Sequence, residues 1–136
     1  MSKAEPMVQK IMTHIPESID VNANVKEAQE KMSRLQIRHL PVLKNGKVFG
    51  IVTDRDIKLA MGLVQLEPAL LKVSDVCHEQ PYSVDPDTPI GQVAATMAEE
   101  KYGSALVVQN GKLVGIITTV DICRALWWVL ETRCHH

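Results

Sequence analysis

The sequence has few aromatic residues, and its charges of opposite sign nearly cancel. Aromatic residues make up 4% of the 136 residues and hydrophobic residues of all kinds 46%, so the core must be built mainly from aliphatic side chains. Lysine and arginine number 15, aspartate and glutamate 16, and the net charge is −1. This balance gives no global basic surface for nucleic acid. A chain of this length buries roughly 68% of its unfolded surface, which suits one compact domain or two very small ones.

Long apolar runs are also missing, and cysteines are few. No run approaches the roughly 18 residues of a membrane-spanning helix, and residues 1–10 lack the apolar segment of a signal peptide. Cys77, Cys123 and Cys134 form no Cys-x-x-Cys pair. We therefore expect a cytoplasmic protein with free thiols and with neither a membrane nor nucleic acid as a partner. We expect Cys77 and Cys123 to be small buried apolar residues.

What the sequence does contain is an internal repeat. Residues 8–60 align with residues 73–125 without a gap, and about fifteen aligned positions are identical. The chain is therefore a duplicated unit, and we refer to the two halves of the repeat as copy one and copy two. A single copy of about 50 residues would be marginally stable alone, whereas two copies can share a core.

Both copies predict the same order of elements: strand, helix, strand, strand, helix. An Asn-Gly pair between the second and third strands is a strong hairpin signal, and it occurs in both copies. The second helix of each copy is expected to begin near Asp54 and near Thr119. The expected strands are residues 18–19, 40–43 and 48–52 in copy one, and 83–84, 105–108 and 113–117 in copy two.

The first helix of each copy has its own start signal. Asn24 can cap the helix of copy one, with Glu27 three residues later, and apolar residues then recur at helical spacing. In copy two, Thr88 is expected to be the cap and Pro89 the first helical residue.

Each copy also has a Thr-x-x-Asp sequence where its second helix begins, at 53–56 and at 118–121. One interpretation is a capping box, which needs no ligand. The other is a nucleotide site, because a carboxylate can accept hydrogen bonds from two vicinal hydroxyls and a helix N-terminus offers free N–H groups to a phosphate. The sequence leaves both interpretations open, and the two can coexist.

The order of elements and three sequence segments closely resemble the CBS domain family, named after cystathionine β-synthase. The segments are Gly-Ile-Val-Thr-Asp-Arg-Asp at 50–56, Gly-Ile-Ile-Thr-Thr-Val-Asp at 115–121 and Arg-His-Leu-Pro-Val at 38–42. The resemblance implies an α+β (α/β) fold. It implies two tandem CBS motifs, each strand-helix-strand-strand-helix, packed as a pseudo-twofold Bateman module. It divides the chain into motif 1 with the N-terminal segment (1–62), a linker (63–72) and motif 2 with the C-terminal helix (73–136).

The resemblance also implies a function. A stand-alone pair of this kind would be a regulatory, ligand-sensing module that binds an adenine nucleotide (AMP, ADP or ATP, with S-adenosylmethionine also open) and is not an enzyme. It would need no cofactor and no metal, it would form a homodimer, and it would act on a target protein that the sequence does not identify. The alternative is a constitutive scaffold or dimerisation module with vestigial ligand clefts.

The site residues follow from the family pattern, position by position. Asp56 and Asp121 match the aspartate that accepts hydrogen bonds from ribose, and Thr53 and Thr118 match the hydroxyl beside it. The other expected ligand-binding positions are Thr13, Ile15, Pro16, Arg38, His39, Leu40, Pro41, Arg55, His78, Gln80, Pro81, Gly103, Ser104, Ala105 and Val120.

The two clefts are expected to differ in their affinity for phosphate. Copy one has cationic or titratable residues at four positions that are uncharged in copy two. These residues are Arg38, His39, Arg55 and Lys58, and their counterparts are Gly103, Ser104, Val120 and Cys123.

The remaining candidates have plainer interpretations. His14, His39 and His78 have no helical metal-ligand spacing and no evident carboxylate partner, so we do not expect a metal site. The end of the chain, Cys134-His135-His136, is expected to be a frayed terminus. Trp127 and Trp128 lie about 100° apart around a helix. We expect at least one of them to contact a second copy of the protein, and the alternative is that both pack on the N-terminal segment.

Overall fold

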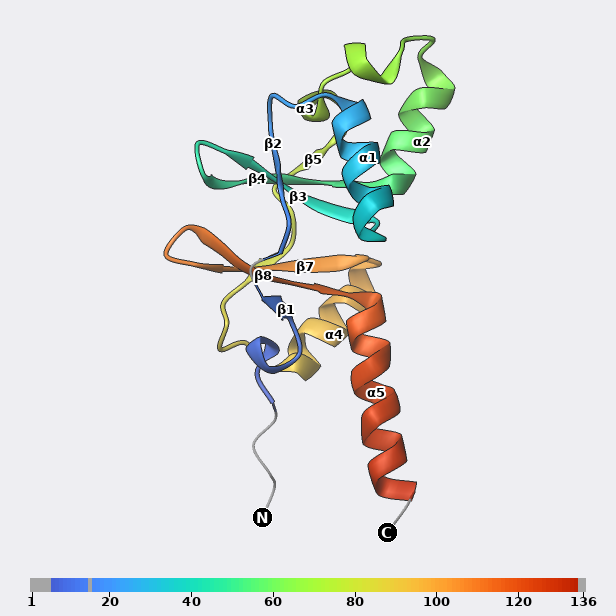
Figure 1. The fold of residues 1–136 in the computed structure, drawn as a ribbon. Coiled ribbons are helices and arrows are strands. Elements are labelled where there is room, and N and C mark those ends of the chain that lie inside the picture. Colours follow the sequence, from blue (N-terminus) through green and yellow to red (C-terminus); the bar gives the residue numbers. More distant parts are fainter. Residues whose placement is uncertain (1–5, 15, 135–136) are drawn as a thin grey trace. The chain divides into compact units, whose positions relative to one another are not determined.

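The computed structural model describes residues 6–14 and 16–134, and the side chains of residues 6–14 and 16–132. The described chain forms two compact units, each a mixture of helices and a four-stranded sheet (Figure 1). The copy-one unit is Glu17–Pro81, and the copy-two unit combines the N-terminal segment up to Pro16 with Tyr82 onwards. The predicted α+β class is confirmed.

The copy-one unit is built around the sheet order β2-β3-β4-β5. Strands β2 and β3 are parallel, and the other neighbours are antiparallel. Helices α1 and α2 lie side by side (Figure 1). The elements are β2 (Ile19–Asp20), α1 (Val25–Leu35), β3 (His39–Lys44), β4 (Lys47–Thr53), α2 (Asp54–Leu63), η2 (Pro68–Leu70), α3 (Val73–Val76) and β5 (His78–Glu79).

The copy-two unit repeats this plan with the sheet order β1-β8-β7-β6. Its last helix, α5, is longer than α2 and continues beyond the sheet (Figure 1). The elements are η1 (Val8–Lys10), β1 (Thr13–His14), β6 (Ser83–Val84), α4 (Ile90–Glu100), β7 (Ser104–Gln109), β8 (Lys112–Thr118) and α5 (Thr119–Cys134).

Each unit has an aliphatic core, as the composition predicts. In copy one, the helical face formed by Val25, Ala28 and Met32 packs on Val42 and Val52 of the sheet. The corresponding core of copy two contains the following buried residues: Val8, Val93, Met97, Ala105, Val107 and Ile117.

The first residues of each copy form an edge strand in the sheet of the other copy's unit. Strand β1 lies near the start of copy one but pairs with β8, so that Thr13 lies opposite Ile116. Strand β5 comes before β6 but pairs with β4, so that His78 lies opposite Ile51. The spatial units and the sequence repeat therefore divide the chain at different places.

This edge pairing explains one glycine in each copy. A Cβ atom on Gly50 would collide with the backbone carbonyl oxygen of His78, and a Cβ atom on Gly115 would collide with the Met12 side chain. Glycine at these positions lets the edge strand approach closely.

Most of the predicted local signals are confirmed. Both hairpin turns have positive φ at the asparagine and at the glycine, with values of 54° and 79° at Asn45 and Gly46. These signs are those of the tight two-residue turn that the Asn-Gly pair favours. The side chain of Asn24 accepts a hydrogen bond from the backbone N–H of Glu27 at 2.9 Å, as a helix cap should.

The predicted cap of α4 is wrong. Pro89 itself is the N-cap residue, the helix begins at Ile90, and no side chain caps it. The N-terminal segment takes over this role, because the N–H of Ile90 donates to the carbonyl of Pro6 at 2.9 Å and the N–H of Val8 donates to the carbonyl of Thr88 at 2.8 Å. The contribution of Thr88 is therefore its backbone carbonyl, which accepts the hydrogen bond from Val8, and not a side-chain cap.

The expectation for the cysteines holds only in part. Cys77 is half-buried, and burial raises the pKa of its thiol. Cys123 is exposed on α5, because the face of the helix that carries it does not pack on the sheet. Cys134-His135-His136 lies outside the residues with described side chains. No helix in the described part of the chain combines the length and apolar character needed to cross a bilayer.

Candidate functional site

In copy one, the Thr-x-x-Asp sequence forms a complete capping box at the start of α2. The backbone N–H of Asp56 donates to Thr53 Oγ1 at 3.1 Å, and the backbone N–H of Thr53 donates to Asp56 Oδ2 at 3.2 Å. The box holds the Asp56 carboxylate at the N-terminal end of the helix, where the helix dipole favours negative charge. Capping thus fixes the position of the carboxylate that the family pattern assigns to ribose.

The same end of the copy-one sheet also holds Arg38 and His39. The backbone N–H of Asp54 donates to the carbonyl of Arg38 at 3.0 Å, and His39 lies opposite Thr53 in the antiparallel β3–β4 pair. Burial lowers the pKa of His39, the nearby Asp56 carboxylate opposes this shift, and Arg38 adds to it. The predicted phosphate-binding and ribose-binding residues of copy one are therefore neighbours.

A contact that we did not predict joins two of the expected site residues. His78 Nε2 lies 2.9 Å from Asp56 Oδ1. The expectation that no histidine has a carboxylate partner is thus wrong for His78. The two residues are 22 positions apart, and it is the pairing of β5 with β4 that brings them together.

Copy two has the same backbone arrangement with different side chains. The backbone N–H of Thr118 donates to Asp121 Oδ2 at 2.9 Å, and the Thr118 hydroxyl lies 3.2 Å from the same oxygen. The N–H of Thr119 donates to the carbonyl of Gly103 at 3.2 Å, as Asp54 does to Arg38 in copy one. The cationic side chain of copy one is therefore replaced by a glycine at the equivalent backbone position.

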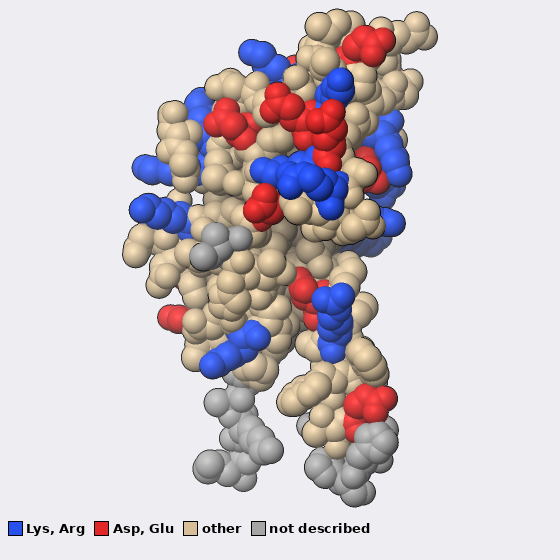
Figure 2. All heavy atoms as spheres, in the orientation of Figure 1, with Lys and Arg blue, Asp and Glu red and all other residues tan. Residues whose placement is uncertain are grey.

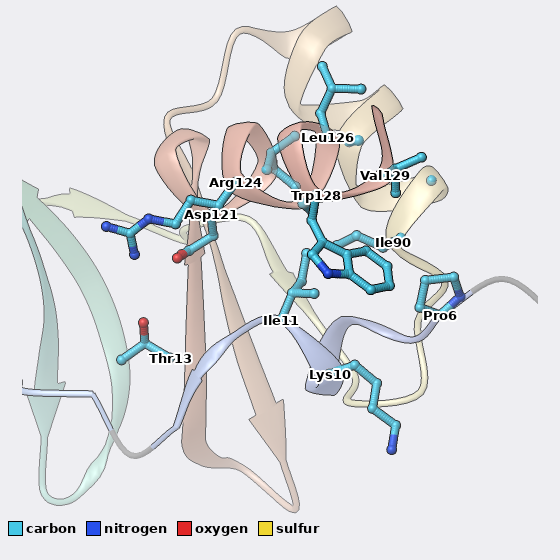
Figure 3. Close-up of a pocket in the computed structure, with 14 residues that line it drawn as sticks. Pro6, Lys10, Ile11, Thr13, Ile90, Asp121, Arg124, Leu126, Trp128 and Val129 are labelled. Atoms are coloured by element: carbon cyan, nitrogen blue, oxygen red, sulfur yellow. The ribbon is translucent and has the colours of Figure 1, made fainter. Parts of the chain in front are cut away.

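A groove of about 1010 Å³ runs beside this part of copy two, between α5, α4 and the N-terminal segment (Figure 3). Thr13 and Asp121 line the groove, and Thr13 occupies the position that His78 has in copy one. Elsewhere the walls are mainly apolar, with Ile11, Ile90 and Trp128 among them. Two cationic residues, Lys10 and Arg124, also line the groove, so the positive charge near Asp121 comes from other positions than in copy one.

The other expected site residues fall into three groups. Leu40, Pro41 and Ala105 are buried in the cores, so they can reach a ligand only through their backbone. Ile15 lies outside the described residues. The remaining expected residues are exposed or half-buried: Pro16, Arg55, Gln80, Pro81, Gly103, Ser104 and Val120.

The charges around the site are only partly available to a ligand. Lys58 forms an ion pair with Asp54 at 3.0 Å, while the Arg38 and Arg55 side chains are exposed. On the face shown in Figure 2, acidic and basic side chains are interspersed and form no continuous basic surface. Among the residues with described side chains, no group of three His, Cys, Asp or Glu is placed to hold a metal ion together.

Known proteins share both the sequence pattern and the fold. The CBS domain profile matches residues 8–62 and 73–127. The AcuB protein of Vibrio cholerae is 30% identical, with a TM-score of 0.86 and coverage of 98% of both chains.

Two further solved structures carry adenosine compounds. The CBS domain pair of protein MJ0100, in complex with 5′-methylthioadenosine and S-adenosyl-L-methionine, is 26% identical, with a TM-score of 0.80 over 90% of this chain and 97% of that one. The protein CBSX2, in complex with AMP, is 25% identical, with a TM-score of 0.76 over 90% and 97% of the two chains. The duplicated Thr-x-x-Asp sites, the two matched segments and the shared fold lead to one conclusion: this chain is a member of the CBS domain family.

Proposed function

We propose that the protein is a regulatory module that binds adenine nucleotides and does not catalyse a reaction. The observation that carries the proposal is the pair of aspartates, Asp56 and Asp121, each held at the start of a helix by the threonine three residues before it. The structures of MJ0100 with S-adenosyl-L-methionine and CBSX2 with AMP support this class of ligand. Regulation requires that the ligand prefer one conformation or assembly over another.

The chemistry of each site suits one part of a nucleotide. An ionised aspartate can accept hydrogen bonds from both hydroxyls of a ribose, and hydrogen bonds to a charged group are worth about 1.5–3 kcal/mol each. The helix dipoles at the starts of α2 and α5 favour an anion. In copy one, Arg38 and His39 add groups that suit a phosphate, so we assign AMP, ADP or ATP to this copy.

A thermal-shift and calorimetric screen tests the proposal. Protein freed of co-purified nucleotide is titrated with AMP, ADP, ATP and S-adenosylmethionine, and with GMP as the control for the base. At a ligand concentration one hundred times the dissociation constant, the folded state should gain about 2.7 kcal/mol. The double variant Asp56→Ala/Asp121→Ala, with its fold checked by circular dichroism, should lose the response. Absence of any shift at millimolar adenine nucleotide would reject nucleotide binding.

One feature favours an assembly role in addition to ligand binding. Helix α5 exposes 57% of Leu126, 66% of Trp127, 69% of Trp128 and 51% of Leu130. Figure 2 shows this helix largely in the colour of uncharged residues. An exposed apolar patch of this kind is typical of an interaction surface, so we include a homodimer in the proposal, with α5 as its contact. If the protein forms this homodimer but binds no nucleotide, it is the constitutive scaffold named above as the alternative.

Light scattering tests the assembly role. We expect twice the chain mass of 15.1 kDa for the native protein and a shift towards the monomer for Trp127→Glu/Trp128→Glu. A native mass that stays at 15.1 kDa at every concentration would rule the homodimer out. The target protein and the cytoplasmic location also belong to the proposal, and the location rests on the free thiols of Cys77 and Cys123.

A further inference from the structure

We propose that His78 is a built-in competitor of the nucleotide at copy one: its imidazole occupies the Asp56 carboxylate until the ribose displaces it. This inference rests on the proposed function and adds a regulatory contact to the same site. It concerns copy one only, because copy two has Thr13 at the equivalent position.

The contacts of Asp56 show why a ribose must compete. Oδ2 of Asp56 accepts a hydrogen bond from the backbone N–H of Thr53, and Oδ1 lies 2.9 Å from His78 Nε2. The Asp56 side chain is 16% exposed and the His78 side chain 69% exposed. A ligand that approaches the carboxylate from solvent therefore meets the imidazole beside it. Two ribose hydroxyls need the acceptor positions that the imidazole now shares.

The imidazole can leave without disturbing the fold. His78 belongs to β5, and its backbone pairs with Ile51 of β4. This pairing does not depend on the side chain, and the exposed imidazole has room to rotate into solvent. The contact is therefore a latch, with one position on Asp56 and others in solvent.

Copy two lacks this latch. Among the described residues, the Asp121 carboxylate is contacted at Oδ2 by the backbone N–H and the hydroxyl of Thr118, at 2.9 Å and 3.2 Å. Oδ1 faces no imidazole, because Thr13 is too short to replace one. A ribose hydroxyl can approach Asp121 without displacing a side chain.

The two copies therefore differ both in the groups available to a phosphate and in the access of a ribose to the aspartate. Copy one has Arg38 and His39 to attract a phosphate but has to release His78 from Asp56. Copy two has an accessible Asp121 and lacks Arg38 and His39, and the cations of its groove are Lys10 and Arg124. A ligand that binds copy one has to displace His78 from Asp56, and a phosphate contact with Arg38 or His39 can offset that cost. Copy one should therefore bind a nucleotide in preference to a nucleoside.

Reciprocal exchange of the two residues tests the latch. AMP binding is measured by calorimetry in two backgrounds, Asp121→Ala to isolate copy one and Asp56→Ala to isolate copy two. In the first background, His78→Thr should tighten AMP binding by roughly tenfold, since a competing hydrogen bond to a charged group is removed. In the second, Thr13→His should weaken AMP binding by a similar factor. His14→Thr, which removes an exposed histidine from β1, is the matched control and should change nothing in the first background.

The outcomes separate the latch from the proposed function. If the Asp121→Ala protein binds AMP and His78→Thr leaves the affinity unchanged or weakens it, the latch is wrong and nucleotide binding stands. If none of the proteins binds AMP, the proposed function and the latch both fail. A second readout needs no nucleotide: ¹⁵N NMR of the imidazole should show the proton on Nε2 of His78, and its signals should move in Asp56→Asn. Ring signals that are insensitive to Asp56→Asn would overturn the contact.

Discussion

The two units have nearly the same backbone but very different side chains at the same positions. Both place an aspartate at a helix start, and in both the first N–H of that helix donates to the carbonyl of the residue just before β3 or β7, which is Arg38 or Gly103. His78, His39 and Arg38 lie around Asp56, whereas Asp121 lies beside Thr118 and in a mainly apolar groove that Lys10 and Arg124 also line. Duplication has thus kept the hydrogen bonds that shape the backbone and changed the groups that a ligand would meet.

The largest difference between the units should come from their close-packed glycines. Gly50→Ala should destabilise the protein by about 3 kcal/mol, because its Cβ would collide with the backbone of β5. Gly115→Ala should cost about 1 kcal/mol, because its Cβ meets the flexible Met12 side chain, which can move. Urea unfolding measures both variants. Gly62→Ala, in open space on α2, is the control and should be neutral or slightly stabilising. Equal losses at Gly50 and Gly115 would contradict the comparison.

The next difference concerns the ligand. Asp56→Ala should weaken AMP binding at copy one by about one to two orders of magnitude, because it removes hydrogen bonds to a charged acceptor. Asp121→Ala should have a smaller effect on the overall affinity for AMP. With adenosine, which has no phosphate, the order should reverse, since copy one then has to open its latch without a phosphate contact in return. Calorimetry of both variants with both ligands gives the four affinities. The same order with adenosine as with AMP would show that phosphate does not distinguish the copies.

A smaller effect separates the two first helices. Asn24→Ala should cost about 1 kcal/mol, because it removes a side-chain cap. Thr88→Ala should cost less than half of that, because the backbone of the N-terminal segment, rather than the Thr88 side chain, supplies the cap of α4. Thermal and urea unfolding compare the two variants. If Thr88→Ala lowers the free energy of unfolding as much as Asn24→Ala does, the Thr88 side chain stabilises the helix and the prediction is wrong.

The smallest effect depends on pH and belongs to copy one alone. Because burial lowers the pKa of His39 below its ordinary value of 6.5, the unfolded chain binds a proton there more readily than the folded chain does. Stability should therefore fall as the pH drops through and below this ordinary value, and His39→Gln should flatten that slope. Unfolding free energies between neutral and mildly acidic pH measure the change. Copy two has Ser104 at this position and contributes no such slope. A steeper slope in His39→Gln would contradict the assignment.

Local signals in the sequence predicted much of the fold. The Asn-Gly turns, the Asn24 cap and the helix starts after Thr53 and Thr118 depend on neighbouring residues, and all of them are found in the structure. The two-residue strands β1 and β5 were not predicted, because segments this short become strands only through their partners. Pro89 was misplaced for the same reason: a distant segment supplies its helix with a cap.

In the candidate site, too, local features could be predicted from the sequence and contacts between distant residues could not. The Thr-x-x-Asp capping box spans four residues and can be predicted directly from the sequence. The contact between His78 and Asp56 depends on the register of β5 against β4, which no local pattern encodes. Once that register is known, the alignment of His78 with Thr13 identifies the difference between the copies at once.

The exchanged edge strands also affect how the chain folds as it leaves the ribosome. Strand β5 follows β4 closely, so the copy-one sheet can be completed soon after residue 79 has emerged. Strand β1 is made first but has to wait for β8, about a hundred residues later, which at 5–20 residues per second is roughly 5–20 s. Until Thr88 and α4 have been made, the N-terminal segment, with Val8 and Ile11, lacks the partners that cover it in the folded unit. A nascent-chain chaperone therefore has more time to bind the apolar side chains of the N-terminal segment than those of the copy-one core.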